Sequence, residues 1–194
     1  MKTYLLDTNI AINFVRNSPL FETINDNLNL LTGEHLILIS EVTIGELLSI
    51  AKRNKWGAKK INRLEAFLQS TDPILISYPD IHEAYADIDA YSQSKHPTLS
   101  LPQGMTARNM GKNDVWIAAT AYVLRATLVT TDKDFDHLQH FFGLEWVEQW
   151  MGYELAILPF FMYFWRKIKV LWQIQWLLVS RVRDSRCCLN VTER

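Results

Sequence analysis

The chain has 194 residues, 48% of them hydrophobic, so it can bury the core of one ordinary domain without disulfides or structural metal. Residues 1–150 carry 13 Lys or Arg against 18 Asp or Glu, and this acidic balance argues against a passive nucleic-acid coat. The only cysteines, Cys187 and Cys188, are adjacent, which excludes a disulfide framework. The first apolar run is too short for a signal peptide, so we expect a cytoplasmic protein.

Short apolar runs alternate with helical patterns in the first half of the chain. Residues 3–6 predict a strand, and residues 8–15 have the apolar spacing of a helix. A second apolar run at 36–39 is followed by Ser40, a suitable N-cap for a helix that starts at the next residue. The further elements expected here are a helix over 58–69, a strand over 74–77 and a helix from 80 to about 94.

The second half of the chain continues this alternation. Residues 96–108 contain Pro, Gly, Ser and Thr and predict a loop, which precedes a helix over 113–124 and a β-branched strand over 127–131. A last short strand is expected at 144–147. Alternating strands and helices predict a mainly parallel sheet with helices on both faces, so we expect a three-layer α/β/α domain over residues 1–150.

Four segments in order carry acidic residues where such a sheet gathers its reactive groups, beyond the carboxyl ends of the strands. They are residues 5–9 (LLDTN), 40–47 (SEVTIGEL), 113–119 (NDVWIAA) and 129–135 (VTTDKDF). A single strand that ends in Asp is common, but the ordered set is specific. It resembles the four motifs of PIN-domain ribonucleases, and most of all those of the VapC toxins of bacterial toxin–antitoxin pairs.

The resemblance implies an endoribonuclease that depends on Mg²⁺ or Mn²⁺. Its catalytic and metal-site acids would be Asp7, Glu46, Asp114 and Asp132. Elementary chemistry agrees, because two unit charges about 4 Å apart repel by roughly 4 kcal/mol at an effective dielectric near 20. A hard divalent cation relieves that repulsion, binds oxygen ligands and lowers the pKa of a bound water.

Neighbouring polar side chains are expected to orient the acids or bound waters. They are Thr8, Asn9, Asn113, Thr130 and Asp134. Thr8 and Asn9 could instead cap the following helix, and the acids themselves could be helix caps and solvated charges. The fourth acid stays open between Asp132, which fits the Thr-x-Asp form best, Asp134 and Asp136.

Basic and histidine side chains offer weaker signals. Arg108 and Lys112 lie just ahead of the third motif and are candidates for contact with RNA phosphates. His137 and His140 are three residues apart, and we interpret them as a surface pair in preference to metal ligands. One basic cluster either contacts RNA or is a solvated helix end: Lys52, Arg53, Lys55, Lys59 and Lys60.

Residues 151–194 lie beyond the resemblance and form a C-terminal extension. Apolar runs at 155–165 and 170–180 are separated by a basic segment at 166–169, so neither run can span a bilayer. Three interpretations stay open. The first is a helix at a membrane surface, which we do not favour. The second is a helix docked on the domain or on a partner. The third is a segment that is not an evolved part of the fold.

The resemblance further implies an RNA substrate, a homodimer, and a small antitoxin that restrains the toxin of a type II pair. A cationic side chain is the simplest inhibitor of an acidic site. We therefore expect the partner's C-terminal segment to lie over the helix at 41–52, with an Arg or Lys near the acids. The alternatives are an inactive PIN-like RNA-binding module, a housekeeping RNA-processing nuclease, and an enzyme acting on DNA or small phosphate esters.

Overall fold

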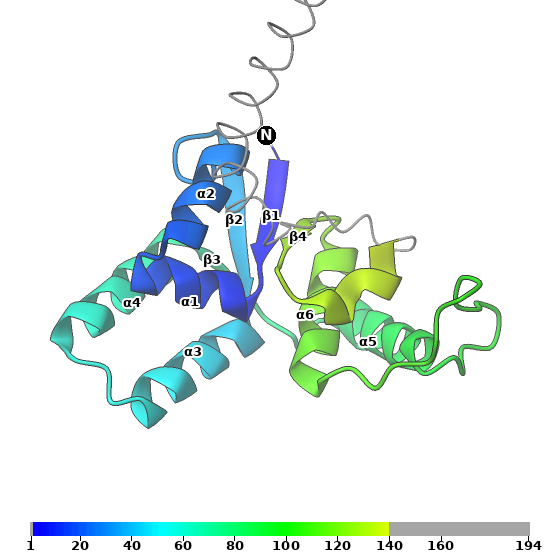
Figure 1. The fold of residues 1–194 in the computed structure, drawn as a ribbon. Helices are drawn as coiled ribbons and strands as arrows, with labels where there is room; N and C mark the ends of the chain where they lie inside the picture. The colour runs from blue at the N-terminus through cyan, green and yellow to red at the C-terminus, as the bar shows by residue number, and fades with distance from the viewer. Residues whose placement is uncertain (1, 140–194) are drawn as a thin grey trace, which may run out of the picture. The chain divides into compact units, whose positions relative to one another are not determined.

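A four-stranded parallel sheet with strand order β3-β2-β1-β4 forms the centre of the fold (Figure 1). The computed structural model describes residues 2–139. The strands are β1 (Lys2–Leu6), β2 (His35–Ser40), β3 (Asp72–Ile74) and β4 (Thr127–Val129). All five residues of β1 pair with β2, so the middle of the sheet is its most regular part.

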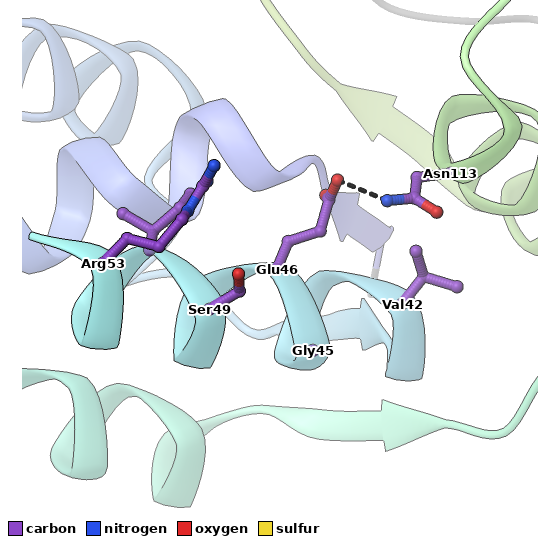
Figure 2. Close-up of a pocket in the computed structure, with 7 residues that line it drawn as sticks. Val42, Gly45, Glu46, Ser49, Arg53 and Asn113 are labelled. Atoms are coloured by element: carbon purple, nitrogen blue, oxygen red, sulfur yellow. Dashed lines mark hydrogen bonds between the residues drawn. The ribbon is translucent and has the colours of Figure 1, made fainter.

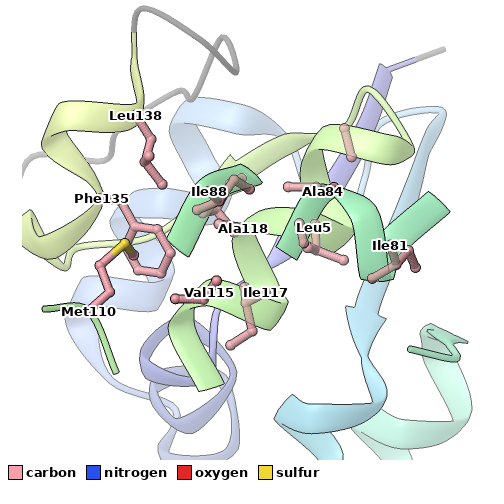
Figure 3. Close-up of a cluster of buried hydrophobic side chains, with 14 of the residues drawn as sticks. Leu5, Ile81, Ala84, Ile88, Met110, Val115, Ile117, Ala118, Phe135 and Leu138 are labelled. Carbon is pink, nitrogen blue, oxygen red and sulfur yellow. The ribbon is translucent and has the colours of Figure 1, made fainter. Parts of the chain in front are cut away.

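Helices cover both faces of this sheet (Figure 1). They are α1 (Thr8–Arg16), α2 (Pro19–Leu28), α3 (Glu41–Arg53), α4 (Ala58–Ser70), α5 (Pro79–Ser92), α6 (Lys112–Val123) and the 3₁₀-helix η1 (Lys133–Leu138). Tyr4 and Leu6 face a core shared with α1 to α4, whereas Leu5 faces the core built by α5, α6 and η1 (Figure 3). Successive side chains of a strand point to opposite faces, so β1 joins two apolar layers. The expected three-layer α/β/α architecture is confirmed.

The edge strands differ from the sequence prediction. The strand expected at 74–77 is instead β3 at Asp72–Ile74, because Ile74 already pairs with Ser40, the last residue of β2. No backbone remains on that neighbour for residues 75–77. At the other edge β4 ends at Val129, two residues early, since its partner Leu6 ends β1. The strand expected at 144–147 lies outside the described residues.

Helix α2 was not predicted, although the sequence carries a start signal for it. The Ser18 side chain accepts a hydrogen bond from the Phe21 N–H at 3.2 Å, and Pro19 occupies the first helical position. Ser followed by Pro is a typical N-cap and N1 pair. Phe21 and Ile24 then bury the helix against the α1 to α4 core.

The interpretation of His137 as a surface residue is wrong. Its ring is fully buried, its Nε2 lies 2.7 Å from the Ser92 Oγ, and it stacks on Tyr91. Phe135 and Leu138 anchor η1 in the same core, and the 3₁₀ turn carries the histidine inward with them. His140 and the extension expected at 151–194 lie outside the described residues. In the part of the chain from 2 to 139, no helix is long and apolar enough to cross a membrane.

Candidate metal and catalytic site

Asp7 stands at the carboxyl end of the central strand β1 and is only 4% exposed. Its backbone N–H donates to the Val129 carbonyl at 3.1 Å, so the ends of β1 and β4 hold it in place. Its Oδ1 accepts from the Thr8 N–H at 2.6 Å, which makes Asp7 the N-cap of α1. Its Oδ2 accepts from the Thr130 hydroxyl at 2.7 Å. The position of this carboxylate is therefore fixed by both strands and by one helix start.

Thr130 connects three groups through one hydroxyl. Besides donating to Asp7, its Oγ1 accepts from the Asp132 N–H at 3.0 Å and from the Asn9 amide at 3.4 Å. The Asn9 Oδ1, on the other side of that amide, is buried and has no hydrogen-bond partner within the described residues. A buried oxygen without a donor costs free energy, so this atom is available to a donor such as a bound water.

Glu46 is held from two other elements. The Thr8 hydroxyl at the start of α1 donates to its Oε2, and the Asn113 amide at the start of α6 donates to its Oε1 at 2.6 Å. Figure 2 shows Glu46 reaching from α3 toward Asn113. Both of its oxygens are thus oriented, and the α3 acid is brought to the edge of the sheet where β1 ends.

Asp114 lies in the first turn of α6 and is half-buried. A Cβ at Gly111 would lie 2.5 Å from its Oδ2, so a side chain at this position would displace the carboxylate. Gly111 was not among the predicted site residues. The signal that could have found it is a Gly three residues ahead of a motif acid, where a helix start approaches the carboxylate closely.

Repulsion between the acids identifies those that face one another. The pKa of Asp7 is raised to about 7, chiefly by burial and to a smaller extent by repulsion from Asp114 and Asp132. Burial also raises the pKa of Asp114 to about 6, with added repulsion from Asp132, Glu46 and Asp134. Thr130 and the Thr8 N–H act in the opposite direction on Asp7. The ends of β1 and β4, α3 and the start of α6 therefore bring at least four carboxyl groups into one electrostatic neighbourhood.

The β4–η1 segment carries three candidates for the fourth acid. Asp132 repels both Asp7 and Asp114, whereas Asp134 repels Asp114 alone. Asp136 raises the pKa of neither carboxyl and acts instead on His137. The Asp132 Oδ1 also accepts from the Asp134 N–H at 2.9 Å and caps η1. Asp132 is thus the member of this group that faces the other acids most directly.

With this geometry established, known proteins provide a comparison. The PIN domain family matches residues 4–140. The chain belongs to this family. A relative named Ribonuclease VapC1 from Haemophilus influenzae strain R2866 is 27% identical over 146 residues, which are 75% of this chain and 98% of the relative. Ribonuclease VapC2 from Rickettsia felis is 26% identical over 144 residues, with 74% and 97% covered.

Solved structures agree on the fold. VapBC2 from Rickettsia felis, bound to a DNA fragment from its promoter, matches with a TM-score of 0.58 at 25% identity, covering 75% of this chain and 98% of that one. VapBC-1 from nontypeable Haemophilus influenzae matches with a TM-score of 0.54 at 24% identity, covering 75% and 97%. The matched length again leaves about a quarter of this chain without a counterpart.

The PIN domain residues fit a hard divalent cation by the chemistry of their donors. Within residues 2–139, no three acidic, histidine or cysteine side chains are arranged to hold an ion by themselves. Mg²⁺ needs no such cage, because it keeps several waters and is bound by one or two carboxylates together with substrate phosphates. Asp7 and Asp114 would supply those carboxylates, and the unpartnered Asn9 Oδ1 would accept from a coordinated water. A bound cation would favour the charged forms of both carboxyl groups and so offset the effect of burial, which raises their pKa values.

The two cations expected to contact RNA are engaged within the PIN domain. The Lys112 ammonium pairs with the Asp89 carboxylate at 3.0 Å, and the Arg108 guanidinium donates to the Lys133 carbonyl at 2.7 Å. The hydrogen bonds of both charged groups are exposed to solvent, and each bond occupies part of the donors of its guanidinium or ammonium group. They support the loop ahead of α6 and the turn into η1 in this arrangement.

A groove of about 510 Å³ opens next to Glu46 and is lined mostly by α3 (Figure 2). Its lining residues are Val42, Gly45, Glu46, Ser49, Ile50, Arg53 and Asn113. Gly45 has open space where a side chain would be, so the PIN domain leaves this part of α3 accessible. The groove connects the acid site to the C-terminal end of α3.

Proposed function

We propose that this PIN domain is a Mg²⁺- or Mn²⁺-dependent endoribonuclease and the toxin of a type II toxin–antitoxin pair acting in the cytoplasm. The observation that carries the proposal is the pair of carboxyl groups, Asp7 and Asp114, whose pKa values burial raises to about 7 and about 6 beside Glu46. Perturbed acids gathered at one site are typical of catalytic centres. The similarity to two proteins named Ribonuclease VapC supports RNA as the substrate.

Each side chain has a distinct role in this proposal. Asp7 and Asp114 hold the cation, which supplies an activated water and stabilises charge on the phosphate when bound. Glu46 and Asp132 complete the acidic site. Thr130 fixes the Asp7 carboxylate, whereas Thr8 and Asn113 fix that of Glu46. Asn9 accepts from a water, and Asp134 holds Asp132 through its N–H.

A cleavage assay tests the proposal against its alternatives. The purified chain is incubated with end-labelled RNA, with DNA of the same sequence and with a small phosphate ester, each in Mg²⁺, Mn²⁺ or EDTA. We expect internal cleavage of RNA with either metal and none in EDTA. An inactive RNA-binding module would bind the RNA without cleaving it. Cleavage of DNA or the ester in preference to RNA would contradict the substrate class.

We also propose a small protein partner, whose C-terminal segment lies over α3 and brings an Arg or Lys to Asp7, Glu46 and Asp114. The structures of VapBC complexes from other bacteria support the existence of such a partner. The groove along α3 offers the surface, and a cationic side chain complements the acids at its end. The test is expression of the chain alone and together with the product of the adjacent gene. Growth arrest that the neighbour relieves supports the toxin assignment, whereas harmless expression of a cleaving enzyme favours a housekeeping role.

Residues 1–150 are proposed as the complete nuclease domain and 151–194 as a separate extension. The PIN match ends at residue 140, and the relatives are covered almost to their full length by three quarters of this chain. A truncation after Gln149 should therefore cleave RNA like the full chain. Light scattering on both forms tests the proposed homodimer and shows whether the extension contributes to it. An inactive or insoluble truncation would make the extension part of the fold.

A further inference from the structure

We propose that the RNA backbone leaves the acid site along α3 and is held by the basic turn between α3 and α4. This turn comprises residues 52–60, and Arg53 is its member inside the groove. The proposal rests on the function proposed above and adds a binding surface for the phosphates that flank the cleaved bond. The ligand is therefore single-stranded RNA, recognised by its charge and not by its sequence.

One face of α3 links the acids to this turn. Glu46, Ser49 and Arg53 are separated by three and four residues, a spacing that aligns side chains along a helix. All three line the same groove, as Figure 2 shows. Seven residues of helix span about 10 Å. A backbone with one phosphate at the acids can thus place a neighbouring phosphate at the Arg53 guanidinium.

The charge of the turn contrasts with the acidic balance of residues 1–150. Residues 52–60 contain five Lys or Arg and no acid, whereas the whole chain has a net charge of −1. All five basic side chains are exposed. None of them makes an ion pair with another residue in the described range 2–139. Their charge is available to an external anion, unlike that of Lys112, which is paired with Asp89.

A purely structural role does not account for the cations of this turn. Lys52 and Arg53 stand in the last turn of α3, where a cation is favourable with the helix dipole. Lys59 and Lys60, by contrast, stand in the first turn of α4, where a cation is unfavourable. That helix start has no acidic residue in its first turn and no side-chain cap. The positive end of the helix dipole and two Lys side chains thus favour the same ligand, an anion.

The turn is also held in a defined shape. The Trp56 N–H donates to the Ala51 carbonyl at 3.0 Å, and Lys55 has a left-handed φ of 47° that reverses the chain. The Trp56 ring packs against the α1 to α4 core, and the Lys60 ammonium lies 5.8 Å from its centre. The basic side chains are therefore displayed from an ordered backbone, which reduces the entropy lost when a phosphate binds.

The test is RNA binding by the full chain in EDTA, measured by fluorescence anisotropy with a short unstructured RNA over a range of salt concentrations. The variant is Arg53→Gln with Lys59→Gln, which leaves the acids and the Trp56–Lys60 contact intact. The matched control is Arg125→Gln with Lys95→Gln, which removes the same charges from exposed positions outside the groove. Each lost phosphate contact should reduce the log–log salt slope by about 0.7. We expect a reduction of about 1.4 and an affinity loss of about 25-fold at 0.1 M salt for the variant, and no change for the control.

The variant should melt close to the temperature of the parent, because the loss of the unfavourable Lys59 cation at the start of α4 offsets the loss of the favourable Arg53 cation at the end of α3. A melting temperature near that of the parent would exclude misfolding as the cause of weaker binding. If the parent cleaves RNA and the variant keeps the parental slope and affinity, the binding surface is wrong while the nuclease assignment stands. A variant that binds RNA normally but escapes restraint by the co-expressed neighbour would assign the turn to the protein partner and overturn the proposal. A parent that neither binds nor cleaves RNA overturns both.

Discussion

The acid site has a strand-borne half and a helix-borne half, and the two are held differently. Asp7 is 4% exposed at the end of β1, and its carboxylate is fixed by one backbone N–H and one buried hydroxyl. Glu46 is half-buried and fixed only by side chains from α1 and α6. Asp114 is half-buried as well, with space ensured by Gly111. The strand half defines where the site is, and the helix half can adjust to what binds there.

The difference has an energetic consequence. Burial raises the pKa of Asp7 to about 7, three units above its ordinary value of 3.8, while that of Asp114 rises to about 6. The strand half therefore carries the larger cost of keeping a charge out of water in the absence of a cation. Substitutions in the two halves should differ in the same sense, with large effects on the strand side and small ones on the helix side.

The largest expected effect is the loss of cleavage on Asp7→Asn. The change removes the buried charge and keeps the shape of the side chain, so RNA cleavage with Mg²⁺ should fall by at least about 100-fold. Asp26→Asn on the exposed surface of α2 is the control and should cleave like the parent. Parental activity in Asp7→Asn would remove the strand half from the proposed site.

The same substitution should stabilise the metal-free protein at neutral and alkaline pH. The folded pKa of Asp7 lies above its unfolded value, so its contribution to stability is largest below about pH 4 and is lost as the pH rises through about 7. Three pKa units correspond to about 4 kcal/mol, an upper limit because the amide matches the hydroxyl of Thr130 less well. Denaturant unfolding in EDTA at pH 5 and pH 8 measures it. We expect the increase in the free energy of unfolding of Asp7→Asn over the parent to be larger at pH 8 than at pH 5. An equal or smaller increase at pH 8 would contradict the burial of a charge at Asp7.

Metal should reverse this cost in the parent. An ion that binds only the folded chain stabilises it by about 2.7 kcal/mol at a hundredfold excess over its dissociation constant. The melting temperature should rise with Mg²⁺ or Mn²⁺ relative to EDTA in the parent, and much less in Asp7→Asn. Superimposable melts of the parent in EDTA and Mn²⁺, without heat of binding by calorimetry, would show that the carboxylates are no metal site.

The strand half was also the part that the sequence predicted best. A short apolar run followed by Asp7, and a β-branched run followed by Asp132, are local patterns that reveal a strand end without knowledge of the fold. The tethers of the helix half depend on long-range contacts, such as that from Asn113 to Glu46 across 67 residues. Their residue types were expected but their partners were not. Gly111 was missed because its one local signal, a place three residues ahead of Asp114, does not by itself show how closely the carboxylate approaches.

Strand limits were predicted correctly where the strand's own sequence pattern sets them. They were mispredicted where the end of a neighbouring strand sets them. Leu75 and Ile76 continue the apolar run in the sequence, yet β3 ends at Ile74 because β2 offers no further partner. The burial of His137 was mispredicted for a similar reason. A histidine in an acidic segment gives no sign that it will pair with a buried, distant residue such as Ser92. Pairing partners and buried hydrogen bonds are properties of the assembled domain.

A medium effect is expected for Gly111→Ala. The added Cβ would lie 2.5 Å from the Asp114 Oδ2, so the carboxylate must turn away. The φ at this position is −56°, which any residue can adopt, and the backbone itself therefore stays unstrained. We expect about a tenfold loss of cleavage, typical of a disturbed ligand orientation, and a melting temperature close to that of the parent. Asp26→Asn, on the exposed surface of α2, again serves as the control. Normal cleavage by Gly111→Ala would show that the exact position of the Asp114 carboxylate does not matter.

The smallest effect is expected for Asn113→Ala, which tests how far the helix half adjusts. The substitution removes the 2.6 Å hydrogen bond to the Glu46 Oε1, but the Thr8 hydroxyl still donates to the other oxygen. Because Asn113 is exposed, water can replace its amide, and the net loss should fall below the range of about 1.5–3 kcal/mol for a bond to a charged group, at about 1 kcal/mol or fivefold in kcat. Asn113→Asp should be worse, since it places a like charge against Glu46, whereas Asn62→Ala on the exposed surface of α4 should change nothing. Equal activities of Asn113→Ala and Asn113→Asp would mean that Glu46 is held by Thr8 alone, and a loss as large as that of Asp7→Asn would end the distinction between the two halves.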